Sequence, residues 1–284
     1  MDIDRIANLT FPPLHQQFDA RDAMLYALSL GYGTDPLNEA DLKFLYEDRL
    51  QAVPAVCNVL CHPGFWLQDP NYAVDWKKIV HAEQAFTLHQ PLPPSGHFRA
   101  EHRIIGMQHN GSARGAMLHV EKTLYADDVA VPLATVRSSI LLRGDGGQGG
   151  FGDSIASPPA LPKREPDRVV FITTQPNAAL IYRLNGDWNP LHIDLAVAHS
   201  AGFSRPMLHG LCTMGIACRA LLDHYGDSDP TCLSTLFTRF SAPVYPGDTL
   251  RFEFHESDTG LRFKAIAQER EAVVLDRCHA TLRT

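Results

Sequence analysis

The chain has 284 residues, 45% of them hydrophobic and 20% charged, a composition that excludes extensive disorder and suits one large domain or two of about 140 residues. Its 25 basic and 32 acidic side chains give a net charge of −7, and the lack of a basic cluster argues against nucleic acid as a partner. The sequence shows no signal peptide, no apolar run of about 18 residues and no Ser-Lys-Leu ending, so we expect a cytoplasmic protein without a membrane span.

The first half of the chain predicts one helix and an antiparallel sheet. Apolar residues at spacings of three and four indicate a helix over residues 21–30. The apolar segment 54–61 is too short to distinguish a strand from a helix. Between residues 97 and 142, apolar and polar residues alternate in three runs separated by turns at 110–111 and 126–128. This alternation is typical of an antiparallel meander.

Glycine, proline and serine dominate residues 144–166, which predicts a linker between two domains, 1–150 and 151–284. Three of these glycines match the G-x-G-x-x-G pattern of dinucleotide-binding loops. That pattern requires a helix after its third glycine, whereas prolines follow here. We therefore expect a linker or crossover loop rather than a cofactor loop.

The second half repeats the plan of strands around a helix. Its strongest helix is apolar nearly all round, which predicts that a sheet wraps it. A helix wrapped by an antiparallel sheet, occurring twice, indicates an α+β fold. The predicted elements are a strand over 169–173, a loop-rich stretch over 182–205, the helix over 206–225, and strands over 248–255, 261–267 and 272–282.

Cysteine and histidine spacing gives no sign of a metal centre. The six cysteines contain no C-x-x-C pair, which favours buried structural thiols over a redox or metal role. The 14 histidines contain no H-E-x-x-H motif. We therefore predict no metal ion.

One segment, YRLNGDWNPLHID over residues 182–194, does not follow the pattern of a helix or strand that builds the scaffold. Asp187 and His192 lie five residues apart across a proline, so a regular helix cannot place them on one face, whereas a loop can. Their polar ends could then share one water molecule. The structural alternative is that Gly186-Asp187 forms a turn and Asp194 caps a helix.

This segment, followed by PMLHG over residues 206–210, resembles the MaoC-like or type 2 enoyl-CoA hydratases of the hotdog superfamily. It departs from their motif at Asn185, where serine or threonine is usual. Further resemblance to the hydratase 2 unit of the peroxisomal multifunctional enzyme type 2 lies in residues 42–47, 81–84, 90–93, 144–152 and 239–247. The resemblance implies a double hotdog, in which the C-terminal half keeps the catalytic motif and the N-terminal half leaves room for an acyl chain.

The resemblance also implies roles for individual residues. Hydration of a 2-enoyl thioester needs a base, an acid and donors to the thioester oxygen. Asp187 and His192 would handle the water and its proton, and Gly210, at a helix start, would donate to the oxygen. Glu47, Glu83 and His209 would support them. Contacts to the CoA thioester are expected from His81, Ala82, Asn110, Trp188, Asn189, Pro190, Leu191 and Phe240, with Arg114 as a substitute for the lysine that often occupies position 110.

The sequence therefore predicts (R)-specific hydration of trans-2-enoyl-CoA to (3R)-3-hydroxyacyl-CoA, with medium to long acyl chains favoured. We expect this reaction to need no cofactor, because CoA is part of the substrate. We also expect the protein to form a homodimer. The alternatives are a MaoC-type dehydratase acting on acyl-carrier-protein or on short branched or dicarboxylic acyl-CoA thioesters, a non-catalytic acyl-CoA binding protein, and a thioesterase.

Overall fold

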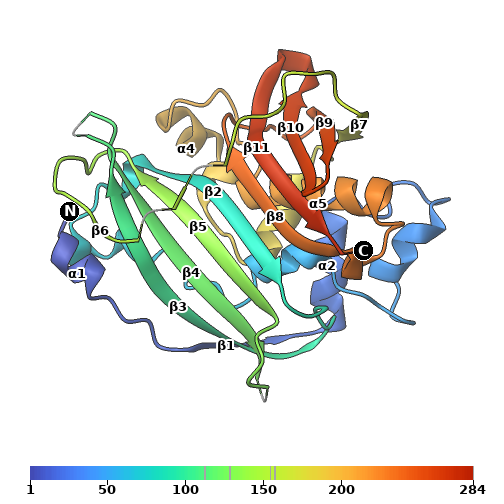
Figure 1. The fold of residues 1–284 in the computed structure, drawn as a ribbon, viewed down its shortest axis with the longest axis horizontal. Helices are drawn as coiled ribbons and strands as arrows, with labels where there is room; N and C mark the ends of the chain where they lie inside the picture. Colours follow the sequence, from blue (N-terminus) through green and yellow to red (C-terminus); the bar gives the residue numbers. More distant parts are fainter. Residues whose placement is uncertain (112, 128, 154, 157, 284) are drawn as a thin grey trace.

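The computed structural model describes residues 1–111, 113–127, 129–153, 155–156 and 158–283. The strands in this part of the chain form one antiparallel sheet in the order β1-β3-β4-β5-β2-β8-β11-β10-β9-β7, with β6 paired to β3 (Figure 1). The strands are β1 Leu14–Phe18, β2 Ile79–Leu88, β3 Gly96–His109, β4 Ala116–Ala126, β5 Ala134–Leu142, β6 Phe151–Gly152, β7 Arg168–Thr173, β8 Leu233–Phe240, β9 Thr249–Ser257, β10 Gly260–Ala267 and β11 Ala272–Leu282.

The α-helices of the described residues are fewer than the strands, and most helices are short. The α-helices are α1 Ile3–Ala7, α2 Ala20–Ser29, α3 Ala178–Tyr182, α4 Leu195–Ser200 and α5 Gly210–Tyr225. Three 3₁₀ helices lie in or beside the segments that carry the predicted active-site residues: η2 Pro54–Asn58, η6 Arg183–Asn185 and η7 Pro190–His192. The others are η1 Glu39–Phe44, η3 Trp66–Gln68, η4 Pro70–Tyr72, η5 Trp76–Lys78, η8 Pro230–Cys232 and η9 Gln268–Arg270.

The sheet consists of two sets of strands that meet where β2 pairs with β8. The N-terminal set holds β1 to β5 and the C-terminal set holds β7 to β11. We call the face covered by α5 and η2 the inner face, and the opposite face the outer face (Figure 1). No helix in the described residues is long and apolar enough to cross a membrane.

Helix α5 is the buried helix that the sequence predicts, but it begins at Gly210 rather than residue 206. The backbone before it is extended, because Leu208 N donates to the carbonyl of Val244 at 2.7 Å. Close packing explains the small residues along the helix: a Cβ on Gly215 would lie 2.4 Å from Leu30. Of its 16 residues, ten are buried, so burial of apolar surface holds this helix in place.

The N-terminal half differs from the expected repeat of a wrapped α-helix. Helix α2 forms as predicted but packs against α3 and η6 of the other half. The segment that packs on β2 and β5 is η2, which resolves the ambiguous stretch 54–61. Three carbonyls, of Cys57, Asn58 and Leu60, accept hydrogen bonds from Lys122 Nζ at 2.7, 3.1 and 2.7 Å. These bonds hold the short helix against the sheet.

The structure confirms the predicted meander as β3, β4 and β5, and the later strands as β7, β9, β10 and β11. It adds β1, β2 and β8, which the alternation pattern did not reveal. The predicted turn at 126–128 includes Asp128, which lies outside the described residues. In the glycine-rich stretch, β6 pairs antiparallel with β3, which does not fit a dinucleotide loop. The division at residue 150 remains a prediction.

Candidate active site

The loop before α4 places Asp187 and His192 through a series of local turns. Gly186 has a φ of 112°, which favours glycine, and it ends η6 just before Asp187. Asn189 then caps η7 by accepting a hydrogen bond from Leu191 N at 3.0 Å. Pro190 occupies the first position of η7. Asp194 caps α4, as the structural alternative for that residue predicted.

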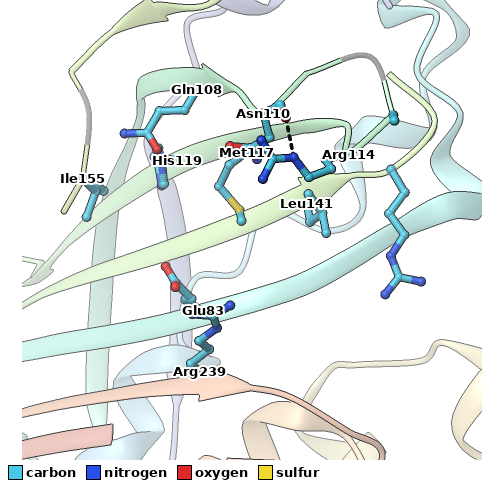
Figure 2. A pocket seen from close by; sticks show the side chains of 11 residues that line it. Glu83, Gln108, Asn110, Arg114, Met117, His119, Leu141, Ile155 and Arg239 are labelled. Atoms are coloured by element: carbon cyan, nitrogen blue, oxygen red, sulfur yellow. Dashed lines mark hydrogen bonds between the residues drawn. The ribbon is translucent and has the colours of Figure 1, made fainter. Parts of the chain in front are cut away.

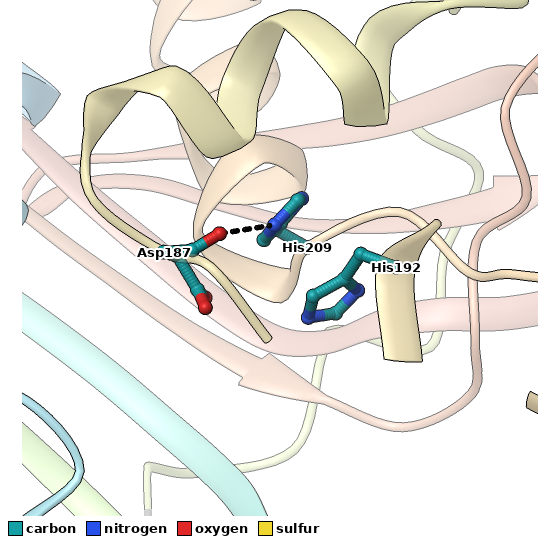
Figure 3. Close-up of side chains that lie close together, drawn as sticks. All are labelled: Asp187, His192 and His209. Carbon is teal, nitrogen blue, oxygen red and sulfur yellow. Dashed lines mark hydrogen bonds between the residues drawn. The ribbon is translucent and has the colours of Figure 1, made fainter. Parts of the chain in front are cut away.

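The structure brings Asp187, His192 and His209 together, with one ligand atom from each within 4.8 Å of the others (Figure 3). Asp187 is exposed, whereas His192 is 9% and His209 1% exposed. The two imidazole rings stack with centroids 3.7 Å apart. His209 precedes α5, so the start of this buried helix completes the cluster.

Hydrogen bonds to carbonyls determine which nitrogens of the two histidines carry protons. His192 donates Nδ1–H to the carbonyl of Met207 at 2.9 Å. In neutral His192, Nε2 is therefore free to accept a proton. His209 donates Nε2–H to the backbone carbonyl of Asp187 at 3.3 Å, as Figure 3 shows. His209 thus holds the Asp187 backbone while packing against the His192 ring.

Burial keeps both histidines neutral at pH 7. Desolvation lowers the pKa of His192 below its usual value, and the nearby Asp187 charge opposes this shift. Desolvation, followed by the neighbouring His192, lowers the pKa of His209 to about 4. The cluster therefore pairs an exposed carboxylate with a buried neutral imidazole, an arrangement that can take a proton from water.

The three residues are also the kinds that bind metals. One possible ligand atom from each lies within 4.8 Å of the others, so the side chains are close enough together to hold a metal ion. One nitrogen of each histidine is already bonded to a carbonyl. The absence of a metal ion in the reaction remains a prediction.

The state of His192 predicts a pH dependence. We expect kcat/KM for hydration to rise as His192 loses its proton and to level off above its pKa, which burial places below 6.5. Asp187→Asn removes the charge that raises this pKa, so the residual activity should have its acid limb at still lower pH. Initial rates with crotonyl-CoA across about pH 4.5–8 measure both limbs. An acid limb above pH 6.5 would contradict this assignment.

The first turn of α5 supplies hydrogen-bond donors beside the cluster. The residue before the helix makes no side-chain cap, so the first backbone N–H groups remain available at the positive end of the helix. Phe240 packs on Gly210: a Cβ there would lie 3.3 Å from its ring. This close contact accounts for glycine at the first helical position, where the sequence predicts the donor to the thioester oxygen.

The N-terminal half contributes His81, whose ring packs edge-on against Phe240 with centroids 5.1 Å apart. A register shift in β2 between His81 and Glu83 places His81 and Gln84 on the same inner face. Gln84 donates from Nε2 to Asn58 at 2.8 Å. Its Oε1 therefore accepts from His81 Nε2 at 2.9 Å and from Ser138 Oγ at 2.6 Å.

Sequence analysis missed Asn58 and Ser138, because they come from separate segments of the N-terminal half. The only signal was His81-Ala-Glu-Gln84, quoted for its resemblance and not for this hydrogen-bond network. The network links Asn58, the last residue of η2, to His81 of β2, whose ring contacts the same Phe240 that packs on Gly210. It makes the position of His81 depend on the packing of both halves.

Of the other predicted site residues, Trp188 lies next to the cluster, whereas Glu47 and Glu83 lie away from it. Trp188 is 57% exposed next to Asp187, and the Arg183 guanidinium lies 4.4 Å from its ring centroid. Glu47 is exposed and makes no hydrogen bond or ion pair with the described residues, so it is not part of the cluster. Glu83 lies on the outer face, on the other side of the sheet from Asp187 and His192. The structure therefore brings neither glutamate to Asp187 and His192.

Asn110 lies at the end of the β3–β4 hairpin, also away from the cluster. Its carbonyl accepts a hydrogen bond from Arg114 Nε at 2.8 Å. Both residues line a cavity on the outer face. Ala82 lies at the β2 register shift, and Asn189, Pro190 and Leu191 form the loop between Asp187 and His192.

Family models match both halves of the chain. Residues 16–144 match the MFE-2 hydratase 2 N-terminal domain, and residues 158–277 match the MaoC like domain. The chain is 38% identical over 281 residues to the enoyl-CoA hydratase ChsH3 of Mycobacterium tuberculosis, covering 97% of this chain and 96% of that protein. It is 34% identical to the peroxisomal multifunctional enzyme type 2 of Drosophila melanogaster, covering 94% of this chain but 46% of that longer protein.

Solved structures show the same fold. The crystal structure of a MaoC-like dehydratase from Phytophthora capsici superposes with a TM-score of 0.87 at 31% identity, covering 100% of this chain and 99% of that one. A Mycobacterium tuberculosis protein described as having a double hotdog fold superposes with a TM-score of 0.59 at 17% identity, covering 97% of this chain and 95% of its own. The expected double hotdog is confirmed.

Proposed function

The chain belongs to the MaoC-like dehydratase family, with an MFE-2 hydratase 2 N-terminal domain ahead of its MaoC-like domain, and we propose that it catalyses (R)-specific hydration of trans-2-enoyl-CoA. The product is (3R)-3-hydroxyacyl-CoA, and the reaction is reversible. The observation that carries the proposal is the pairing of exposed Asp187 with neutral, buried His192 beside the start of α5.

The geometry supports a general acid–base mechanism. Water held between the Asp187 carboxylate and His192 Nε2 gives up a proton as its oxygen bonds to C3 of the enoyl group. The negative charge that develops on the thioester oxygen is stabilised by the backbone N–H of Gly210. The proton taken up by the dyad is then delivered to C2 on the same face, so that water is added across the double bond without a net change in the enzyme.

We further propose that medium to long acyl chains are favoured. The support is the difference between the two halves: the long helix α5 packs in the half that carries Asp187 and His192, whereas the short helix η2 packs on β2 and β5 of the other half. A short helix leaves more of the inner face to an acyl chain. The cytoplasmic location and the homodimer remain predictions, the second testable by light scattering at micromolar concentration.

Activity assays of the purified protein with crotonyl-CoA and 2-decenoyl-CoA test this proposal. We expect loss of enoyl absorbance with both thioesters, a higher kcat/KM with the longer one, and a (3R) product on chiral analysis. A (3S) product would refute the stereochemical assignment, and a strong preference for crotonyl-CoA would refute the preference for longer chains. Lack of turnover with either substrate would favour an acyl-CoA binding protein.

A further inference from the structure

Two polar residues interrupt the apolar inner face of the N-terminal half. His102 of β3 and Lys122 of β4 are register partners, so their side chains lie on the same face of the sheet. The residues two places before and after each of them on this face are apolar: Ala100, Ile104, Val120 and Leu124. Both polar side chains are buried, with His102 8% and Lys122 5% exposed. Polar groups buried in such surroundings need hydrogen-bond partners.

Lys122 has partners, but His102 does not. The Nζ of Lys122 donates to three carbonyls of the η2 segment, so all three of its protons are bonded. Both ring nitrogens of His102 are buried and have no hydrogen-bond partner among the residues that the structure describes. The ring packs against Phe11, with centroids 5.8 Å apart, and Phe11 has no polar side-chain atom. His102 is therefore available to a polar group from outside the chain.

The segment 58–62 connects His102 to the candidate active site. Its first residue accepts a hydrogen bond from Gln84, which also bonds to His81 near the start of α5. The carbonyl of its third residue accepts a hydrogen bond from Lys122, the register partner of His102. The same short stretch of backbone therefore borders both the active site and the unpaired histidine.

His62 lies at the end of this segment and is exposed. Desolvation nevertheless lowers its pKa to about 4, and the charges of Lys122, Asp187 and His81 also act on this pKa. A side chain that water reaches, but that is strongly desolvated, lines a recess rather than an open surface. Asp187 is exposed as well, so the recess at His62 is continuous with the site where water would be activated.

The two histidines offer complementary hydrogen bonds. Gly64 N donates to His62 Nδ1 at 3.1 Å, so in the neutral ring Nε2 carries the proton and can donate. Desolvation, followed by the charges of Lys122 and His62, lowers the pKa of His102 to about 4. His102 is therefore neutral at pH 7, and it offers one donor and one acceptor.

The chemistry of these groups selects among substrates. A purely hydrocarbon chain would leave both nitrogens of His102 unpaired. An ionised carboxylate would find no charged donor, because Lys122 has already used its three protons. A hydroxyl group both donates and accepts, so it can satisfy two neutral imidazoles. We propose that His62 and His102 bind a hydroxyl group on the acyl chain of the substrate, an inference that rests on the proposed function.

The order of strands indicates where on the acyl chain this hydroxyl lies. In the sequence β3-β4-β5-β2, three strand spacings separate β3, which carries His102, from β2, which carries His81. Three spacings amount to roughly 14 Å. The hydroxyl is therefore remote from the thioester, at or near the end of a medium to long chain.

Initial rates with pairs of thioesters test this preference. We compare 10-hydroxy-2-decenoyl-CoA with 2-decenoyl-CoA, and 12-hydroxy-2-dodecenoyl-CoA with 2-dodecenoyl-CoA. For at least one pair, we expect the wild-type kcat/KM to be roughly 10-fold higher with the hydroxylated member. His102→Leu should remove this preference and keep the rate with the unsubstituted member. No preference in the wild type for either pair would overturn the proposal. A preference that His102→Leu leaves unchanged would also overturn it, because His102 would then bind only an ordered water.

His102→Leu should fold, because it replaces a buried imidazole that has no partner with an apolar side chain. Its melting temperature should be no lower than that of the wild type. His62→Phe is a second variant, at an exposed position, and should reduce the same preference. If both histidines bind one hydroxyl, the effects of the two substitutions on this preference should not add in the double variant.

His119→Leu is the matched control. His119 lies on β4, is 2% exposed and has a buried Nε2 without a partner in the described part of the chain. It faces the opposite side of the sheet, where it lines the cavity that also contains Asn110 and Arg114 (Figure 2). This variant should keep the wild-type preference. Loss of the preference in His119→Leu as well would reveal a general effect of packing and would refute the assignment to the inner face.

Binding of unreactive analogues separates failure of this proposal from failure of the proposed function. Calorimetry compares 10-hydroxydecanoyl-CoA with decanoyl-CoA, which both lack the double bond, and the twelve-carbon pair in the same way. Tighter binding of a hydroxylated analogue by the wild type but not by His102→Leu, without turnover of any enoyl thioester, would refute hydratase activity and support the hydroxyl site. Turnover of all four enoyl thioesters without a preference would support hydratase activity and refute the hydroxyl site.

Discussion

Asp187→Asn and His192→Gln are each expected to lower kcat by roughly 10²–10⁴, the contribution usual for a general acid or base. Asp187→Asn keeps the shape of the side chain while removing its charge and basicity. His192→Gln keeps a polar group while removing the imidazole that titrates. Because both residues act on one water, the double variant should be little worse than the poorer single variant.

The structure supports normal folding of both variants. Asp187 is exposed, and its side chain accepts a hydrogen bond from Asn189 N at 3.2 Å, which an asparagine oxygen can accept equally well. At position 192, a glutamine amide can still donate to the Met207 carbonyl that now accepts from the ring. The loss should therefore appear in kcat and not in the melting temperature.

Asp194→Asn is the matched control in the same loop. Asp194 caps α4 by accepting from Ala196 N at 2.8 Å and Val197 N at 3.1 Å, and asparagine caps helices equally well. Steady-state rates with crotonyl-CoA, together with thermal melts, should show normal turnover for this variant. Near-normal turnover in folded Asp187→Asn or His192→Gln would mean that the loop is a turn motif and that other residues carry the catalysis.

Lys122→Met should give the largest loss of stability. It leaves three carbonyls of the η2 segment without the donor they now share. Each buried acceptor left unpaired costs about 1–3 kcal/mol, and removal of a buried charge offsets part of that cost. Burial lowers the pKa of Lys122 to about 8, so at pH 7 the ammonium is protonated and all three bonds are present. We expect a net loss of about 2–4 kcal/mol in the free energy of unfolding.

Urea unfolding at pH 7 measures this loss, with Lys163→Met as the control because Lys163 is exposed in the linker. The control should change the free energy of unfolding by less than about 0.5 kcal/mol. Any folded Lys122→Met protein should also turn over more slowly, since η2 holds Asn58 and, through Gln84, His81. A stability equal to that of the wild type would show that the three carbonyls find other donors.

Part of the fold and part of the candidate site could be predicted from the sequence alone. Alternation over a strand and the apolar character of residues 206–225 are local patterns, so they predicted the meander and the buried helix. The proximity of Asp187 and His192 could also be predicted, because both belong to one short loop whose glycine and proline restrict the backbone. Asn185 departs from the usual motif, but its side chain donates hydrogen bonds to the Tyr182 carbonyl and to Ser29 Oγ. Asparagine is therefore compatible with the conformation of this loop.

The tertiary structure decided how distant segments meet. Pairing of β2 with β8 brings His81 to Phe240, a separation of 159 positions in the chain, and no local period encodes that pairing. A one-residue register shift in β2 sends Gln84 to the inner face and Glu83 to the outer face, which is why the glutamate predicted as a support lines a separate cavity. Side-chain types determine what chemistry is possible, whereas the packing of the two sheet halves determines which side chains share one space.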